Sequence, residues 1–222
     1  HRTIWIGGQI MVKIEKELEV NEDSVKRMAE SVVQMHEKVV CVLEKPSREI
    51  ALDIVQGDDF INHLEEEIND QSVRSLALLS PVASDLRKVV ADIKIASELE
   101  RIADYAKNIA AFLIKSEVLE ENVMAYAAAM EKRFIEMLKE TLKAYEQRDV
   151  KAAFQLPKKD EGINQLYEEL KQNLLRHPNE TLVVELFEIS AMLRNIERAG
   201  DHTKNICEHI IYMVKGQHYD FG

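Results

Sequence analysis

Pairs of acidic residues four positions apart occur in both halves of this sequence. Glu197 and Asp201 lie in the stretch NIERAGDHTKNICEHI, and Glu100 and Asp104 lie in ELERIADYAKNI. At that spacing two acids share one face of a helix and repel each other by a few tenths of a kcal/mol. Carboxylates held this close cannot all ionise cheaply unless a cation sits among them. The pattern therefore predicts a site for a multivalent metal ion.

An internal repeat places these acids in equivalent positions. The segment around Glu100 matches the segment around Glu197, which lies 97 residues later. The segment DDFINHLEEEI, which begins at Asp58, matches DEGINQLYEEL, which begins at Asp160. An internal repeat of this kind indicates that the chain is built from one structural unit used twice. We expect two similar units, each with an acidic middle helix and an acidic last helix.

Each unit is predicted to fold its two acidic segments together as an antiparallel helical hairpin. The first hairpin turns at Pro81, which is equally far in sequence from Asp58 and from Asp104. The second turns between Glu180 and Thr181, within the stretch RHPNET. The oxygen-bearing side chains of each hairpin then meet within about one helical turn, roughly 5 Å along the axis. The predicted metal ligands are Asp58, Asn62, Glu66, Glu100 and Asp104 in the first unit, and Asp160, Asn164, Glu168, Glu197 and Asp201 in the second.

Oxygen ligands of this kind suit Mg, Mn, Ca or Fe ions, and Zn is also acceptable. His202, next to Asp201, could bind the ion or orient one of its ligands. A competing interpretation treats the acids as solvated charges that pair with Arg101 and Arg198, ion pairs of small value when exposed. Recurrence in both units favours the metal. The other histidines share no spacing and are expected at the surface or facing a partner: His36, His63, His177, His209 and His218.

The composition limits the fold class and the partners. The 222 residues are 46% apolar, and only seven Gly and four Pro interrupt them, which favours long helices. A net charge of −11 gives no electrostatic reason to bind nucleic acid, whose phosphates attract basic surfaces. No apolar run approaches the roughly 18 residues that a membrane span needs. Cys41 and Cys207 match no zinc spacing, and we expect buried, reduced thiols of a cytosolic protein.

Six long helices account for the stretches between turn signals, giving an all-α fold of two tandem three-helix bundles, 12–116 and 119–216. Residues 1–10 precede the first Met and are expected to be irregular. Ser47 is predicted to cap the second helix, and Ser80 and Pro81 to begin the third. The expected helices are 13–44, 48–79, 81–116, 120–147, 150–175 and a last one from the end of RHPNET to Gly216.

Two stretches resemble the signature helices of the PhoU family, the phosphate-uptake regulators of bacteria. They are PVASDLRKVVADIKIASELERIADYAKNIA and NIERAGDHTKNICEHIIYMVKG, while DDFINHLEEEI resembles the family's acidic second helix. The resemblance covers nearly the whole chain after Met11, and it implies a six-helix PhoU-like fold. It also implies metal ions or multinuclear clusters at four motifs, which map onto Asp58/Asn62, Glu100/Asp104, Asp160/Asn164 and Glu197/Asp201.

The sequence departs from the family pattern at two places. Asn62 and Asn164 end the second-helix motifs, and amides are poorer metal ligands than carboxylates. Ala103-Asp104-Tyr105 stands where the family usually has Gly-Asp-His. Both departures are expected to reduce metal occupancy, mostly in the first unit.

The function implied by the resemblance is that of a non-catalytic, cytoplasmic repressor of the phosphate-starvation response when phosphate is plentiful. Expected partners are the ATPase subunit of the phosphate ABC transporter and the sensor histidine kinase of the phosphate regulon, which would hold it peripherally at the membrane. A homodimer is also expected, and the bound metal would be Fe, Zn, Mn or Mg. Two alternatives stay open. One is a carboxylate-bridged metal enzyme, whose di-iron form needs Glu-x-x-His pairs that this sequence lacks. The other is a purely structural helical bundle.

Overall fold

The computed structural model describes residues 2–116, 120–176 and 182–222, and the regular elements of that part are all helical. The predicted all-α fold class is therefore confirmed. The helices are α1 (Arg2–Glu44), α2 (Arg48–Leu79), α3 (Ala83–Lys115), α4 (Glu121–Gln147), α5 (Val150–Gln155), α6 (Asp160–Arg176) and α7 (Leu182–Lys215), with a 3₁₀ turn at Leu156–Lys159.

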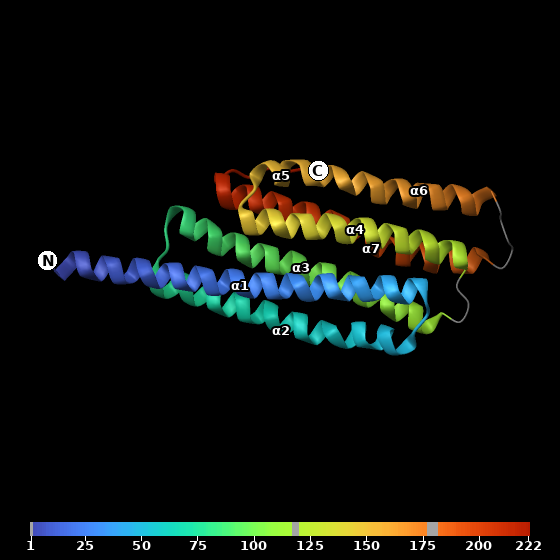
Figure 1. Cartoon of the computed structure of the whole chain (residues 1–222), viewed down its shortest axis with the longest axis horizontal. Helices are drawn as coiled ribbons and strands as arrows, with labels where there is room; N and C mark the ends of the chain where they lie inside the picture. Colours follow the sequence, from blue (N-terminus) through green and yellow to red (C-terminus); the bar gives the residue numbers. More distant parts are fainter. Residues whose placement is uncertain (1, 117–119, 177–181) are drawn as a thin grey trace.

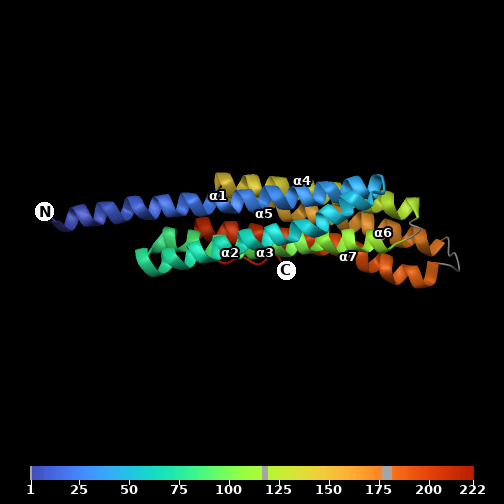
Figure 2. The ribbon, with the colours of Figure 1, turned by 90° about the horizontal axis from the view of Figure 1, so that it is seen from below.

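The helices form two elongated three-helix bundles that lie side by side (Figures 1 and 2). In the first bundle α3 packs against α1 and α2, and in the second α7 packs against α4 and α6. The repeat-equivalent helices α3 and α7 form the largest interface between the bundles, and α1 and α4 form another. The first turns of α1 project beyond the other helices (Figure 1). The domain limits 12–116 and 119–216 stay a prediction.

Local sequence signals set some of the helix ends. Ser47 caps α2 as predicted, since its hydroxyl oxygen accepts a hydrogen bond from the backbone N–H of Ile50 at 3.3 Å. The predicted start of the third helix at Ser80 and Pro81 is wrong. Ser80 adopts a left-handed conformation (φ 43°) that closes α2, and α3 begins only at Ala83. A residue before proline is disfavoured in the right-handed helical region, which separates the two helices here.

Two other expectations about the helices are corrected. The predicted helix 150–175 is interrupted by the 3₁₀ turn that contains Pro157, because proline lacks the N–H and its ring obstructs the preceding turn. Residues 1–10 were expected to be irregular, but α1 is already helical from Arg2, since no proline breaks it. The predicted turn at Glu180–Thr181 lies outside the described residues. No described helix has a segment long and apolar enough to cross a membrane.

Helices α3 and α7 bury many apolar side chains. Leu99, Ile196 and Ile206 are each fully buried. Cys207 is also buried, and burial raises the pKa of its thiol to about 12. Cys41 is exposed, so the prediction of two buried thiols is wrong for this residue.

His36 is fully buried where α1, α3 and α4 meet, and the prediction that it lies at the surface is wrong. Its Nδ1 lies 2.9 Å from a carboxylate oxygen of Glu131, and its Nε2 lies 2.8 Å from the backbone carbonyl oxygen of Ile102. Both ring nitrogens face groups that can accept, and an imidazolium, which donates from both nitrogens, satisfies them. Burial acts to lower the pKa of His36, but the Glu131 carboxylate outweighs it and the pKa is raised. This ion pair joins the two bundles.

A second buried polar cluster joins α1, α3 and α4 further along the molecule. The ammonium of Lys88 donates to Asp92 and to the hydroxyl oxygen of Tyr145, each at 2.8 Å. Tyr145 in turn donates to Asp92 at 2.6 Å, and the Asn21 amide donates to the same carboxylate at 3.4 Å. Burial raises the pKa of Asp92. Because its donors meet acceptors, the cluster fixes the relative positions of the three helices.

Candidate metal centre

The acidic side chains of the first unit converge between α2 and α3. Asp58 on α2 and Glu100 and Asp104 on α3 each offer one carboxylate oxygen, and these three oxygens all lie within 4.8 Å of one another. Asp58 is buried, with 4% of its surface exposed, and the other two are half-buried. The predicted meeting of Asp58 with Asp104 agrees with this geometry. We call these three residues the first centre.

The electrostatics of the first centre favour a cation. Burial and the neighbouring Asp104 raise the pKa of Glu100 to about 7, and burial also raises the pKa of Asp104. One oxygen of Asp58 accepts from Lys107 at 3.1 Å and from Asn62 at 3.3 Å. Its other oxygen, Oδ1, is buried without a hydrogen-bond partner. Buried acceptor oxygens normally have a hydrogen-bond donor or a bound ion beside them. A metal ion that bridges α2 and α3 would satisfy this oxygen. The donor set therefore fits an oxygen-coordinated ion.

The other predicted ligands of the first unit lie at the margin. Asn62 is half-buried and bonded to Asp58, whereas Glu66 is exposed and does not join the converging oxygens. Glu65 faces the centre instead. It contributes to the raised pKa of Glu100, and its own pKa is raised by burial. Sequence reasoning chose the step of four from Asn62 to Glu66, although Glu65 lies seven residues, about two turns, after Asp58.

The second unit is arranged differently. Asp160 on α6 is buried, Glu197 on α7 is half-buried, and the Asp201 side chain is 51% exposed. These described residues bring no three carboxylate oxygens within 4.8 Å of one another. Asp160 packs against the backbone of α7 at Gly200, where a Cβ atom would overlap its Oδ1. Burial raises the pKa of Asp160, while the nearby Lys204 acts to lower it. We call Asp160 and Asp201 the second centre.

The remaining predicted ligands of the second unit do not point into one site. The Asn164 amide donates to Asp160 at 3.5 Å, and its own carbonyl oxygen is buried without a partner. Glu168 is 63% exposed in its side chain and pairs with Lys171 at 3.1 Å. Its position matches that of Glu66 in the first unit. The outer acids of both repeats are therefore solvent-facing.

His202 is directed away from Asp201, at the interface between α3 and α7. Its Nδ1 lies 2.5 Å from Glu98, and its Nε2 lies 3.0 Å from the hydroxyl of Tyr105, its equivalent in the first repeat. His209 lies 3.4 Å from the other oxygen of Glu98. Burial acts to raise the pKa of Glu98, but hydrogen bonds from His202 and His209 lower it to about 2. His202 thus joins the bundles rather than orienting a ligand.

The cations that contact the acidic centres are lysines, which sequence reasoning missed. Lys107 contacts Asp58, and Lys204 contacts Asp160 and Asp201. The two lysines occupy equivalent repeat positions, three residues after Asp104 and Asp201, and that recurrence was the available signal. Arg101 and Arg198, the cations proposed in the competing interpretation, are both exposed.

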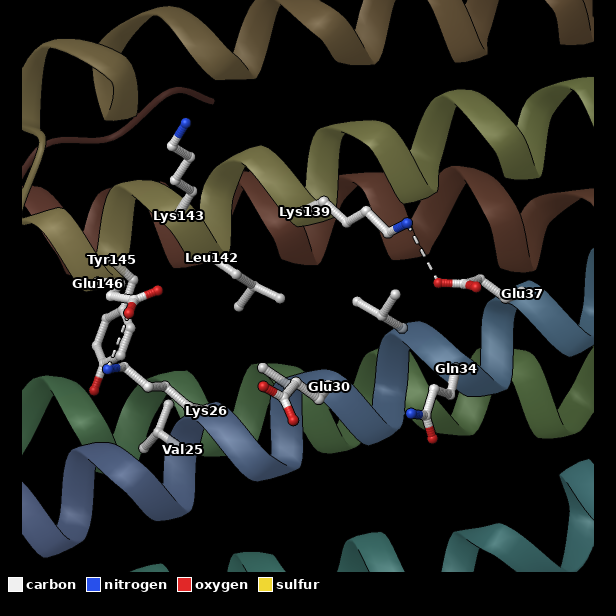
Figure 3. Close-up of a pocket in the computed structure, with 12 residues that line it drawn as sticks. Val25, Lys26, Glu30, Gln34, Glu37, Lys139, Leu142, Lys143, Tyr145 and Glu146 are labelled. Carbon is white, nitrogen blue, oxygen red and sulfur yellow. Dashed lines mark ion pairs between the residues drawn. The ribbon is translucent and has the colours of Figure 1, made fainter.

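A groove of about 440 Å³ lies apart from these centres, between α1 and α4 (Figure 3). Its floor contains Val25, and charged side chains of opposite sign pair across it. Lys26 lies 3.2 Å from Glu146, and Lys139 lies 3.4 Å from Glu37. These charges are already matched, so the groove offers no concentrated charge for an ion.

The family model described as the PhoU domain matches twice, over residues 25–113 and 128–210. The chain belongs to the PhoU family. The two PhoU matches fall on the two bundles, in agreement with the internal repeat.

Named PhoU relatives cover almost the whole chain. The phosphate-specific transport system accessory protein PhoU of Serratia marcescens is 33% identical over 96% of this chain and 88% of its own length. The protein of the same name from Escherichia coli K12 is 31% identical over 96% and 90%. These names describe an accessory protein, so the chain belongs to a family of accessory proteins and not of enzymes, as predicted.

Two solved PhoU structures share the fold. The crystal structure of PhoU from Pseudomonas aeruginosa superimposes with a TM-score of 0.83 at 29% identity, over 91% of this chain and 99% of that one. The phosphate transport system regulatory protein PhoU from Streptococcus pneumoniae gives 0.80 at 27% identity, over 94% and 100%. The predicted PhoU-like arrangement of two three-helix units is therefore confirmed.

Proposed function

We propose that this chain is a cytoplasmic negative regulator of phosphate uptake and of the phosphate-starvation response. The observation that carries the proposal is the match to phosphate-specific transport system accessory proteins over both repeats. The proposed partners are the ATPase subunit of the phosphate transporter and the sensor histidine kinase of the phosphate regulon. An acidic surface, with a net charge of −11, suits contact with basic patches on such partners. Homodimerisation stays a prediction.

We further propose that a metal ion, with Fe, Zn, Mn or Mg as candidates, binds at the first centre. The positive charge of such an ion would offset the repulsion between carboxylates that lie on two helices. Asp58 would hold it from α2, and Glu100 and Asp104 would hold it from α3, within the geometry that brings their oxygens together. Held this way, the first hairpin would present one fixed surface to a partner.

The proposed contacts can be tested by affinity purification of the tagged protein from phosphate-replete cells. We expect the transporter ATPase and the sensor kinase to co-purify, and the Asp58→Asn/Asp104→Asn variant to recover less of both. The charge-matched variant Asp59→Asn/Asp70→Asn, altered at two exposed positions of α2, should recover wild-type amounts. Recovery of neither partner would contradict the regulatory proposal.

Metal removal should lower the thermal stability of the protein. An ion present at about 100 times its Kd stabilises the folded state by about 2.7 kcal/mol. For a chain of this length that amounts to roughly 5–10 °C in Tm. We expect EDTA to lower the Tm of protein loaded with Mn²⁺ by this amount, measured by calorimetry. The Asp58→Asn/Asp104→Asn variant should not respond to EDTA, whereas Asp59→Asn/Asp70→Asn should respond like the wild type. An unchanged Tm, with no metal in the purified protein, would rule out the metal proposal and leave the regulatory one standing.

A further inference from the structure

The ammonium group of Lys204 lies between the two carboxylates of the second centre. Its Nζ is 3.2 Å from Asp160 on α6 and 3.4 Å from Asp201 on α7. The Lys204 side chain is only 20% exposed, and that of Asp160 is 5% exposed. The lysine therefore bridges the two helices of the second hairpin through Oδ2 of Asp160, as a metal ion would, whereas Oδ1 of Asp160 is buried without a hydrogen-bond partner.

The equivalent lysine of the first unit is placed differently. Lys107 lies 3.1 Å from Asp58, its side chain is 41% exposed, and Asp58 is its only ion-pair partner among the three acids of the first centre. Glu100 and Asp104 therefore face the Asp58 carboxylate without an ammonium that pairs with either of them. The first centre therefore keeps a larger excess of negative charge, with three carboxylates against one ammonium, than the second centre, with two against one.

The residues around the two centres reinforce this asymmetry. Glu65 faces the first centre, but the equivalent position of the second unit holds the neutral Tyr167, whose hydroxyl is bonded to Ser190 at 3.0 Å. Asn69 in the first unit corresponds to Lys171 in the second, which lies over the Tyr167 ring, 3.9 Å from its centroid. At these two positions the second unit thus has one acid fewer and one lysine more than the first.

We infer that Lys204 is the resident cation of the second centre, so that metal ions bind at the first centre and not at the second. Only the statement that metal ions bind at the first centre rests on the proposed metal function; the role of Lys204 does not. An ion entering the second centre must displace an ammonium that is paired with a buried carboxylate. Breaking such a pair costs free energy, because the buried Asp160 carboxylate or the displaced Lys204 ammonium is left without its partner in a poorly solvated place. All five ligands predicted for the second unit, Asp160 included, are therefore not metal ligands in the wild-type protein.

The decisive measurement is Mn²⁺ binding to the full chain, followed by electron paramagnetic resonance at pH 7. In the Asp58→Asn/Asp104→Asn background, which lacks the first centre, we expect only weak binding. Adding Lys204→Met should tighten it about tenfold or more, since one adjacent charge shifts a local ionic equilibrium by about that factor. The matched control, Lys107→Met in the same background, should not tighten binding. A further Asp160→Asn change should abolish the gain.

Thermal unfolding of the metal-free protein gives a second readout. Lys204→Met should lower the Tm, because Asp160 is left buried without its cation, and added Mn²⁺ should restore it. Asp160→Asn/Lys204→Met, which removes both charges, should melt near the wild type without responding to Mn²⁺.

The two proposals fail in different ways. If the wild type binds no Mn²⁺ but Lys204→Met creates a site, the metal function fails and the role of Lys204 stands. If the variant lacking the first centre binds Mn²⁺ as tightly as wild type, and Asp160→Asn removes that binding, the inference about Lys204 is overturned. The same holds if Lys204→Met changes neither Mn²⁺ binding nor the Tm.

Discussion

Replacing His36 by Leu is expected to lower the free energy of unfolding at pH 7 by about 3–5 kcal/mol, the usual cost of leaving one member of a buried ion pair unmatched. The Glu131 side chain has no exposed surface, so water cannot take the place of the imidazolium. The carbonyl oxygen of Ile102 would also lose the hydrogen bond that it accepts from the imidazole ring, and would keep only its helical one. Urea unfolding followed by circular dichroism measures the change.

Two control variants separate the ion pair from simple packing. His36→Leu/Glu131→Met removes both charges, and it should recover most of the loss, because apolar pairs of similar volume are often neutral or stabilising. Glu131→Gln should be milder than His36→Leu, since neutral His36 can accept a hydrogen bond from the amide. If the double variant is as unstable as His36→Leu, the loss comes from packing against Phe134, whose ring centroid lies 4.6 Å away, and not from charge.

The same pair predicts a pH dependence of stability. The pKa of His36 in the folded protein is raised above its ordinary value of 6.5, so the folded state binds this proton more tightly than the unfolded chain. The contribution of protonated His36 to the free energy of unfolding is complete below about pH 6.5. It is lost as the pH rises through the higher pKa of the folded state. Wild-type stability should therefore fall faster above pH 6.5 than that of His36→Leu/Glu131→Met. Parallel curves for the two proteins would refute this role of His36.

Substituting Ala for Gly200 should destabilise the protein by about 1–3 kcal/mol, the usual range for overpacking a buried site. The new Cβ atom would overlap Oδ1 of Asp160 and lie 3.4 Å from Ile163. The carboxylate must then move away from α7, which also weakens its ion pair with Lys204. Urea unfolding of the metal-free protein measures the loss directly.

The matched control is Gly57→Ala on α2. A Cβ atom there meets only Met35, at 4.0 Å, in ordinary contact. Removing a helical glycine without strain should stabilise the protein by about 0.4–1 kcal/mol, mainly by restricting the unfolded chain. The two glycine substitutions should therefore have opposite signs. A stabilising Gly200→Ala would mean that Asp160 is not held against the backbone of α7.

Much of the fold and of the first centre could be predicted from sequence, because both depend on consecutive helices that are joined by a short turn. Apolar periodicity and a few turn signals define the helices, and a short turn makes consecutive helices antiparallel neighbours. Within such a hairpin the number of residues to the turn decides which positions face each other. Counting from Pro81 therefore placed Asp58 opposite Asp104, and the structure brings them together with Glu100. The repeat extended this layout to the second unit.

The rest depended on the packing of the two bundles, about which local patterns carry little information. His36 was expected at the surface, but α4 covers it and supplies Glu131, a partner 95 residues away. Similarly, His202 contacts Glu98 because α7 packs against α3. Residues adjacent on a helix differ in direction by about 100°, which is why Glu65 and not Glu66 faces the first centre.

What the sequence by itself determined was where carboxylates gather in the first repeat, and which positions of the second repeat correspond to them. Only the tertiary structure decided how lysines neutralise the carboxylates of each repeat. Lys204 lies between two acids in the second repeat, and Lys107 lies beside a single acid in the first. A flexible lysine reaches many positions, and the one it occupies depends on the burial and charge of groups on neighbouring helices.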